Sequence, residues 1–216
     1  MSQTVISSQD PRDIRGEAFR NARTLDEQLS IINEVSYLRD GEATILYGLA
    51  SEAVKAFTTA GMTPAPFVEV GSRFGCSTMV LALAARQHGW LTVLGIDPHQ
   101  WRPQPLMGSD SMMKLYQNLT ETGLLDRVTP ILGLSHEILP LLPEMSLLFI
   151  DGDHTCEGVL SDLRSIRPEV WNSPAIVCGH DYDASSKGEI TDALMIFLAD
   201  HPWRVQVRES IWWMER

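Results

Sequence analysis

The stretch FVEVGSRFGCST, residues 67–78, decides the fold class that this sequence predicts. It places a run of mostly apolar residues, Phe67 to Val70, directly before a turn that holds Gly71 and Gly75. An apolar strand, a glycine turn and a helix begin a βαβ unit, and the turn lets a ligand approach the main chain closely. Many purely structural turns also contain two glycines, so the rest of the chain has to show whether this turn binds a ligand.

Strand-length apolar runs alternate with helical patterns after this turn. The runs are Phe67–Val70, Thr92–Ile96, Val128–Leu132, Leu147–Ile150 and Ala175–Cys178. The helical patterns are about Ser77–His88, Ser111–Thr122, Ser135–Leu141, Cys156–Ile166 and Glu189–Asp200. This alternation predicts an α/β fold with a parallel sheet covered by helices on both faces. Two final β-rich runs, Val205–Arg208 and Ser210–Met214, predict an antiparallel hairpin.

Two helices are predicted before the first strand. One follows Thr24, which forms a capping-box pattern with Glu27, and the other covers residues 41–59 and ends before Gly61. We therefore predict a helical cap over residues 1–62 that belongs to the same globular unit as an α/β domain over residues 63–216.

The composition restricts the classes of partner. The 216 residues include 17 basic and 28 acidic side chains, and the net charge of −11 argues against nucleic acid as a partner. The sequence contains no leader-like or membrane-spanning apolar run, which predicts a soluble cytoplasmic protein without a membrane partner. The cysteines, Cys76, Cys156 and Cys178, are too far apart in sequence for a zinc-like motif and are expected to be reduced.

Polar residues end the second and third predicted strands, where parallel sheets bind ligands. Asp97 lies 22 residues after Gly75, and its carboxylate can accept hydrogen bonds from both hydroxyls of a ribose. The alternative for Asp97 is a turn cap beside Pro98. Ser135 follows the third strand, where it can contact a base or cap the next helix. Either Ser77 or Thr78 is expected to cap the helix after the glycine turn.

Two clusters of acids and histidines follow the fourth and fifth strands. They consist of Asp151, Asp153 and His154, and of His180 and Asp181. Carboxylates beside an apolar core are costly unless they share a cation, a basic partner or a proton. Oxygen ligands suit magnesium, calcium or manganese, whereas aspartate with histidine also suits iron or zinc. Without a metal, Asp153, His154 or His180 can serve as a general base. Each residue alone also fits a cap or a turn.

Four stretches in this order resemble a known family: FVEVGSRFGCST, GIDPH, LLFIDGDHTCEGVLSDL and GHDY. They resemble class I S-adenosylmethionine-dependent methyltransferases, in the branch that includes macrolide and aminocoumarin sugar O-methyltransferases and cephalosporin hydroxylase-like proteins. The resemblance covers about residues 65 to 214. It implies a Rossmann-like sheet of seven strands that ends in an antiparallel hairpin, in agreement with the hairpin predicted above from the final β-rich runs.

The resemblance also implies roles for individual residues. The residues implied to bind S-adenosylmethionine are Glu69, Gly71, Ser72 and Gly75 at its methionine part, Asp97 at the ribose, Ser135 at the adenine, and Asp151. In metal-dependent relatives, acids that match Asp151 and the His180–Asp181 pair bind magnesium, and an acid that matches Asp153 is a candidate base. His180 stands where those relatives tend to carry a second acid.

The expected function is methylation of a small-molecule hydroxyl with S-adenosylmethionine, assisted by a divalent cation such as magnesium. The alternatives are a metal-dependent hydroxylase-like enzyme and a non-catalytic cofactor-binding protein on the same scaffold. A nicotinamide dehydrogenase is disfavoured because GSRFG departs from the GxGxxG spacing and places Arg73 at a middle position. The segment from Trp101 to Met113 is expected to form a lid. Trp212 and Trp213 are expected to pack in the core or against a second subunit, which leaves a homo-oligomer open.

Overall fold

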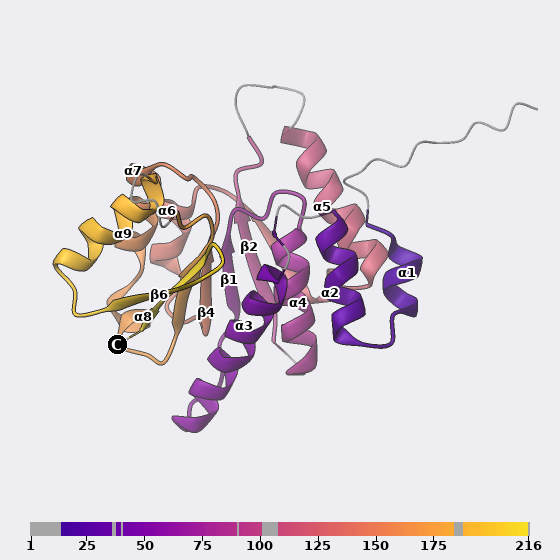
Figure 1. The fold of residues 1–216 in the computed structure, drawn as a ribbon, viewed down its shortest axis with the longest axis horizontal. Helices are drawn as coiled ribbons and strands as arrows, with labels where there is room; N and C mark the ends of the chain where they lie inside the picture. Colours follow the sequence, from indigo (N-terminus) through magenta and orange to yellow (C-terminus); the bar gives the residue numbers. More distant parts are fainter. Residues whose placement is uncertain are drawn as a thin grey trace, which may run out of the picture.

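A seven-stranded sheet organises the chain (Figure 1). The structure is a computed structural model that describes residues 14–35, 38–39, 41–89, 91–100, 108–183 and 188–215. The strands are β1 (Phe67–Val70), β2 (Val93–Asp97), β3 (Val128–Leu132), β4 (Leu147–Ile150), β5 (Ile176–Gly179), β6 (Arg204–Arg208) and β7 (Ile211–Glu215). Their order across the sheet is β3-β2-β1-β4-β5-β7-β6.

The strand directions confirm the predicted α/β fold. Strands β1 to β5 run parallel, and β7 is antiparallel to both β5 and β6, so the predicted terminal hairpin is present. Strands β2 and β5 each end one residue later than predicted. The pairing of Asp97 with Leu132 of β3 extends β2 to the acid itself, which fixes the carboxylate at the sheet edge.

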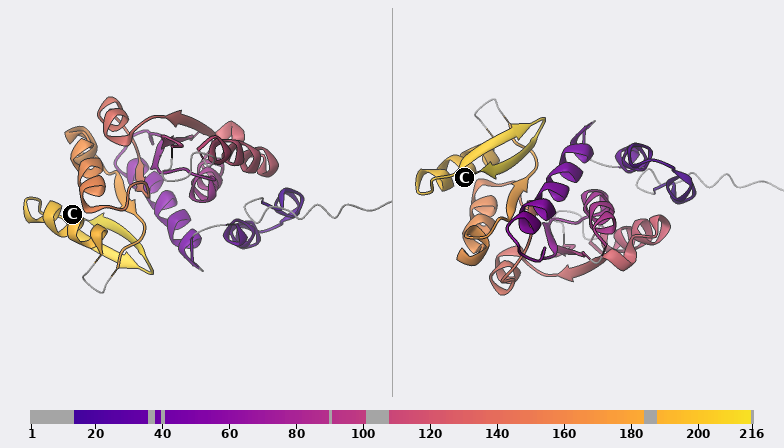
Figure 2. Two further views of the ribbon diagram at one scale, coloured as in Figure 1. Left: turned by 90° about the horizontal axis from the view of Figure 1, so that it is seen from above. Right: turned by 90° about the horizontal axis from the view of Figure 1, so that it is seen from below.

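Helices cover both faces of the sheet and one end of the molecule. They are α1 (Gly16–Asn21), α2 (Leu25–Glu34), α3 (Glu42–Thr59), α4 (Cys76–Gln87), α5 (Gly108–Thr122), α6 (Ser135–Ile138), α7 (Cys156–Ser165), α8 (Pro168–Trp171) and α9 (Glu189–Ala199), with 3₁₀ turns η1 (Leu125–Arg127) and η2 (Leu139–Leu141). Figure 2 shows α1 and α2 at one end of the molecule and α9 with β6 at the other. The sequence did not predict α1 and α8, because 6 and 4 residues are too few to show a helical period.

The central strands bury side chains on both faces, which explains their nearly continuous apolar sequence. Phe67 and Phe149 pack on the side of α3 and α4, whereas Val68 and Leu148 pack on the side of α7 and α9. Burial of one such side chain contributes about 1.5–3 kcal/mol. The two apolar layers therefore hold the carboxyl ends of the strands in a fixed arrangement.

The N-terminal helices pack beside the sheet domain. The predicted capping box at the start of α2 is confirmed: the Glu27 amide donates to Thr24 Oγ1 at 3.2 Å, and the Thr24 amide donates to Glu27 Oε2 at 3.2 Å. Helix α1 contacts α5, α2 contacts α4, and α3 packs along α4. This packing supports the predicted cap, while its boundary at residue 62 stays a prediction.

The tryptophans of β7 lie on opposite faces of the sheet. Trp212 is fully buried on the α9 side and donates from Nε1 to the carbonyl oxygen of His180 at 3.2 Å. Trp213 packs against the other layer. Trp212 therefore has the expected core role and also holds the end of β5. Within the described residues, no helix is long and apolar enough to cross a membrane.

Candidate functional site

A cavity of about 1070 Å³ lies beyond the carboxyl ends of the parallel strands. The segments that contribute most to its wall are residues 70–74, 96–100, 134–136, 151–155 and 180–181. The strand order changes direction at β1, where β2 lies on one side and β4 on the other. Ligands of open parallel sheets bind in the crevice at this point, so the fold itself locates the candidate site.

The turn after β1 requires its first glycine. Gly71 has φ +94°, and a Cβ there would overlap the carbonyl oxygen of Asp151. The main chain of β1 and the loop after β4 therefore touch at the cavity floor. Gly75, with φ +89°, is the N-cap of α4 and faces Leu115 rather than the cavity.

The expected cap role of Ser77 or Thr78 is wrong. Both residues lie inside the first turn of α4, whose N-cap position belongs to Gly75 and has no side-chain cap. The hydroxyl of Thr78 instead donates to Glu69 Oε2 at 2.5 Å. A buried carboxylate is costly without hydrogen-bond donors, and the Thr78 hydroxyl supplies one to Glu69.

Glu69 lies beneath the cavity floor and has no solvent exposure. Burial raises its pKa to about 7, against the effect of the surrounding hydroxyl groups. Glu69 Oε1 and the hydroxyl of Ser72 are buried, and each lacks a hydrogen-bond partner of normal geometry among the described residues. Of the residues implied to line the methionine part of a cofactor, Gly71 and Ser72 reach the cavity wall, whereas Glu69 and Gly75 do not.

Asp97 is held in place by two backbone amides. Its Oδ2 accepts from the Arg73 amide at 2.8 Å, and its Oδ1 accepts from the His99 amide at 2.6 Å. The alternative role of Asp97 as a turn cap is therefore present. Each carboxylate oxygen keeps a second lone pair, so the same group remains able to accept from the hydroxyls of a ligand in the cavity.

Ser135 does not cap α6 as expected, because Leu134 is the N-cap residue. The Ser135 hydroxyl donates to Asp162 Oδ1 at 2.5 Å instead. Asp162 is buried on α7, and burial raises its pKa to about 6. Both side chains reach the cavity wall. Asp162 was not predicted from the sequence, although an acid within the apolar pattern VLSDL was an available signal.

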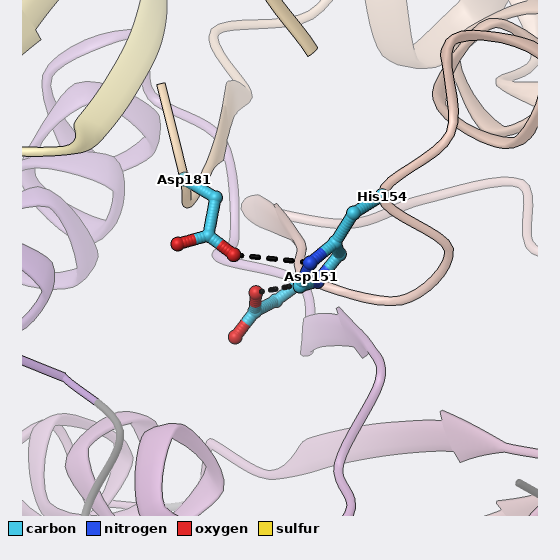
Figure 3. Close-up of side chains that lie close together, drawn as sticks. All are labelled: Asp151, His154 and Asp181. Carbon is cyan, nitrogen blue, oxygen red and sulfur yellow. Dashed lines mark ion pairs between the residues drawn. The ribbon is translucent and has the colours of Figure 1, made fainter. Parts of the chain in front are cut away.

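Asp151, His154 and Asp181 form a compact group at the ends of β4 and β5 (Figure 3). His154 Nε2 lies 3.4 Å from Asp151 Oδ1, and His154 Nδ1 lies 3.0 Å from Asp181 Oδ2. The hydrogen bond to Asp151 raises the pKa of His154 against the effect of partial burial, and the charges of both acids add to the increase. Each residue offers one ligand atom within 4.8 Å of the others, and two carboxylates with an imidazole suit a divalent cation.

His180 has a different environment from the one that the sequence suggested. The side chain is buried, and its Nε2 lies 3.0 Å from Oε2 of Glu42, a residue that was not predicted from the sequence. Its Nδ1 lies 3.5 Å from Asp151 Oδ1 and 3.2 Å from Asp181 Oδ1. Burial alone would lower the pKa of His180, but hydrogen bonding to Asp151 and the negative charges of Asp151 and Asp181 raise it to about 9. His154 belongs to the compact group, whereas Nδ1 of His180 lies beside the same two acids, and the role of His180 as a metal ligand stays a prediction.

Asp153 lies on the exposed rim of the cavity. Its Oδ1 accepts from the Thr155 amide at 3.0 Å, and the Thr155 hydroxyl in turn accepts from the Gly158 amide at the start of α7. Asp153 therefore shapes the turn before α7, and its expected role as a base stays a prediction.

Backbone strain is concentrated in the cavity wall. Among the described residues, four that are not glycine have positive φ angles, and three of them line the cavity: Arg73 at 41°, His99 at 47° and Asp181 at 58°. Each such residue costs about 1–3 kcal/mol, and such costs cluster at ligand sites. The Arg73 guanidinium lies 5.0 Å from the centre of the Phe74 ring.

Of the predicted lid, residues 101–107 lie outside the described residues, and the rest belongs to α5.

The family model described as "Methyltransferase domain" matches residues 68–182, which span every strand tip that forms the cavity. Several solved structures share the fold. The O-methyltransferase NovP has a TM-score of 0.61 and 19% identity over 79% of this chain and 78% of its own. For CalS11, a TDP-rhamnose 3'-O-methyltransferase, the TM-score is 0.57 and the identity 16%, over 92% of this chain and 90% of its own.

A third similar structure is the O-methyltransferase TomG from Streptomyces achromogenes, in complex with S-adenosylmethionine. Its TM-score is 0.55, with 17% identity over 82% of this chain and 80% of its own. None of the curated proteins matches the chain significantly. At these identities the solved structures establish the Rossmann-like methyltransferase fold.

Proposed function

Since this chain belongs to the methyltransferase-domain family, we propose that it transfers the methyl group of S-adenosylmethionine to a hydroxyl of a small molecule. The observation that carries the proposal is one continuous cavity. It joins the Gly71 turn and the amide-held carboxylate of Asp97 to the group of Asp151, His154 and Asp181. The first part of the cavity, at Gly71 and Asp97, suits a nucleoside. The second part, at Asp151, His154 and Asp181, suits a hydroxyl that has to lose its proton.

The first part of the cavity offers residues that would bind S-adenosylmethionine. The turn at Gly71 lines the cavity, and the glycine lets the main chain of β1 lie against the loop after β4. Ser72 lies in the cavity wall beside Gly71 and would line the methionine part, and Asp97 would accept from the ribose hydroxyls. Ser135 and Asp162 would lie at the adenine end. Glu69, below the floor, would act on the cationic sulfonium through its charge rather than by contact.

The second part of the cavity supplies candidate bases. When S-adenosylmethionine is bound, it provides a methyl group on a positively charged sulfur. Transfer of that methyl group would break the carbon–sulfur bond, leave its electron pair on the sulfur and form a carbon–oxygen bond with the acceptor. The acceptor proton has to pass to a group of the protein, and Asp153, His154 and His180 are the candidates. Because the pKa of each histidine is raised, either ring could accept the proton only in its neutral form. The protein would contribute chiefly by holding oxygen, methyl carbon and sulfur in line.

A divalent cation would be held by Asp151 and Asp181, with His154 as the third ligand in this geometry and His180 adjacent. Such a cation would supply a positive charge that favours loss of the acceptor proton. Magnesium is the cation that we propose, because both acids offer hard oxygen ligands. The same donor set also suits iron, and this is the observation that favours the second candidate, a metal-dependent hydroxylase-like enzyme.

The proposed acceptor is a small molecule rather than a nucleic acid, since the net charge of −11 would repel phosphate chains. CalS11 is a TDP-rhamnose 3'-O-methyltransferase, and this supports including sugar hydroxyls among the first acceptors to test.

The test is a transfer assay with methyl-labelled S-adenosylmethionine and a panel of hydroxylated metabolites, with and without magnesium and chelator. The proposal predicts label in at least one acceptor, with stimulation by magnesium. Metal analysis of protein purified without chelator separates the candidates: bound iron together with oxygen-dependent turnover, without methyl transfer, would favour the hydroxylase-like enzyme. Binding of the cofactor without turnover of any acceptor would favour a non-catalytic binding protein.

A further inference from the structure

The first residue of α3, Glu42, is a fully buried acid that reaches the end of β5. Four donors converge on its carboxylate. Oε2 accepts from the Arg39 amide at 2.5 Å and faces His180 Nε2 at 3.0 Å, while Oε1 accepts from the Ser210 amide at 3.2 Å and the Ser210 hydroxyl at 2.5 Å. Residues from the helical cap, from β5 and from the β6–β7 turn therefore meet at one side chain.

This set of contacts suits an ionised carboxylate. Burial by itself would raise the pKa of Glu42, but the hydrogen bonds from Ser210, the Arg39 amide and His180 lower it below its usual range. A buried charge without such donors is strongly destabilising, and here donors are provided on both oxygens. A neutral amide at this position has only one acceptor oxygen, so it could not serve all of these groups.

The two ring nitrogens of His180 face different groups of the protein. Its backbone is fixed, because its amide donates to the Ile150 carbonyl at 3.2 Å and its carbonyl accepts from Trp212 Nε1 at 3.2 Å. Its Nε2 is directed at Glu42, which accepts hydrogen bonds only, so a proton resides on Nε2. Nδ1 is then the ring nitrogen that faces Asp151 and Asp181.

We propose that Glu42 is a positioning residue for the active site: it holds the Nε2 proton of His180 and fixes the ring so that Nδ1 faces the reacting part of the cavity. A carboxylate that orients a site histidine from behind is a recurrent arrangement. The inference rests on the proposed function in one respect: the part of the cavity that Nδ1 faces has to be the part where the methyl group is transferred. It adds that the helical cap supplies a residue on which the site depends.

The first experiment observes the ring proton directly on the full-length protein without added ligand. In ¹⁵N-histidine-labelled protein, the Nε2 proton of His180 should give a downfield, slowly exchanging proton resonance, assigned by its absence in His180→Asn. We expect Glu42→Gln to lose or strongly shift this resonance. Ser210→Ala, which removes one donor from the other carboxylate oxygen, should retain it. An unchanged resonance in Glu42→Gln would overturn the proposal.

A second variant guards against misfolding. Glu42→Asp keeps the charge but withdraws the carboxylate by one methylene, and it should weaken protection of the same resonance in a protein that melts cooperatively. If Glu42→Asp is folded and its resonance exchanges as slowly as in wild type, the proposed contact is wrong.

The activity measurement separates this inference from the proposed function. Once an acceptor is identified, Glu42→Gln should lower kcat by roughly 10- to 100-fold, the usual effect of losing such a supporting partner. Binding of S-adenosylhomocysteine should be unchanged, because Glu42 does not line the cavity. The loss should not add to that of His180→Asn in the double variant, and full additivity would refute positioning. Failure of wild type to bind S-adenosylhomocysteine would instead refute the proposed function and leave the ring-proton result intact.

Discussion

The carboxylate of Asp97, at the end of β2, accepts a hydrogen bond from the backbone amide of Arg73, beyond the end of β1, at 2.8 Å. This contact ties together two neighbouring strand tips across the mouth of the cavity. It also explains how an arginine can occupy the turn: the backbone of Arg73, in the left-handed region at φ 41°, supplies the contact. The backbone in the middle of this turn therefore orients Asp97. In a pyrophosphate-binding loop, the same position is often a glycine that lets the phosphate approach the backbone.

Replacement of Asp97 should weaken cofactor binding. Asp97→Ala removes the acceptors proposed for the two ribose hydroxyls, each worth about 0.5–1.5 kcal/mol as a net hydrogen bond and more with a charged acceptor. We expect the Kd for S-adenosylhomocysteine to rise by roughly 10- to 100-fold or more in isothermal titration calorimetry. Asp126→Ala is the matched control, since that side chain is 69% exposed and lies outside the cavity. Equal affinities of Asp97→Ala and wild type would remove Asp97 from the site.

Gly71→Ala should lower the free energy of unfolding more than Gly123→Ala, a substitution at another glycine with positive φ. Both Gly71 and Gly123 have positive φ, which costs alanine about 1–2 kcal/mol, but only at Gly71 would the new Cβ overlap the Asp151 carbonyl. We expect Gly71→Ala to lose at least about 1 kcal/mol more than Gly123→Ala in urea denaturation, by the usual scale of overpacking. Equal losses would show that the two loops do not touch as described.

Glu69 should make stability depend on pH. Its pKa is about 7 in the folded protein and 4.5 in the unfolded chain, so the folded state binds the proton more tightly. Below pH 4.5, Glu69 is neutral in both states, so its ionisation does not lower the free energy of unfolding. As the pH rises through 7, keeping the buried acid neutral or ionising it lowers the free energy of unfolding. Relative to Glu69→Gln, wild type should therefore lose up to about 3 kcal/mol between pH 4.5 and pH 8. The free energies of unfolding in urea for the two proteins measure this difference, and a gap that stays constant with pH would contradict the burial of Glu69.

The proposed cation site should be detectable without an acceptor. Titration with manganese, followed by electron paramagnetic resonance, should show binding to wild type that falls by at least roughly 10-fold in Asp181→Asn, because the variant loses a charged ligand. His136→Ala is the control, because His136 lines the cavity outside the compact acid and histidine group. If Asp181→Asn binds manganese as wild type does, the acids do not hold the cation.

The sheet was predicted well from the sequence because the signals for a strand and for a turn lie within a few neighbouring residues. Apolar runs bounded by turns located the five parallel strands, and the charged break before Ser210 located the terminal hairpin. The positions of Asp97, Asp151 and Asp181 at one edge of the sheet follow from this topology alone. Short helices without a full period, such as α1 and α8, carry no comparable local signal.

Side-chain partners across the fold could not be predicted in the same way. Glu42 and His180 are separated by 138 positions, and nothing near either residue in the sequence indicates the other. Ser135 and Thr78 each follow a strand and look like helix caps, but both hydroxyls bond to buried acids instead. In both cases the desolvation of a carboxylate, which depends on tertiary packing, outweighs a local preference.

The central claim is that the cavity binds S-adenosylmethionine, and calorimetric titration of the full-length protein with S-adenosylmethionine and S-adenosylhomocysteine tests it most directly. The account predicts saturable binding of both ligands at a single site, in a protein whose cooperative unfolding shows that it is folded, with the affinity weakened in Asp97→Ala. Absence of heat and of any thermal stabilisation by either ligand, at concentrations up to the millimolar range, would contradict it.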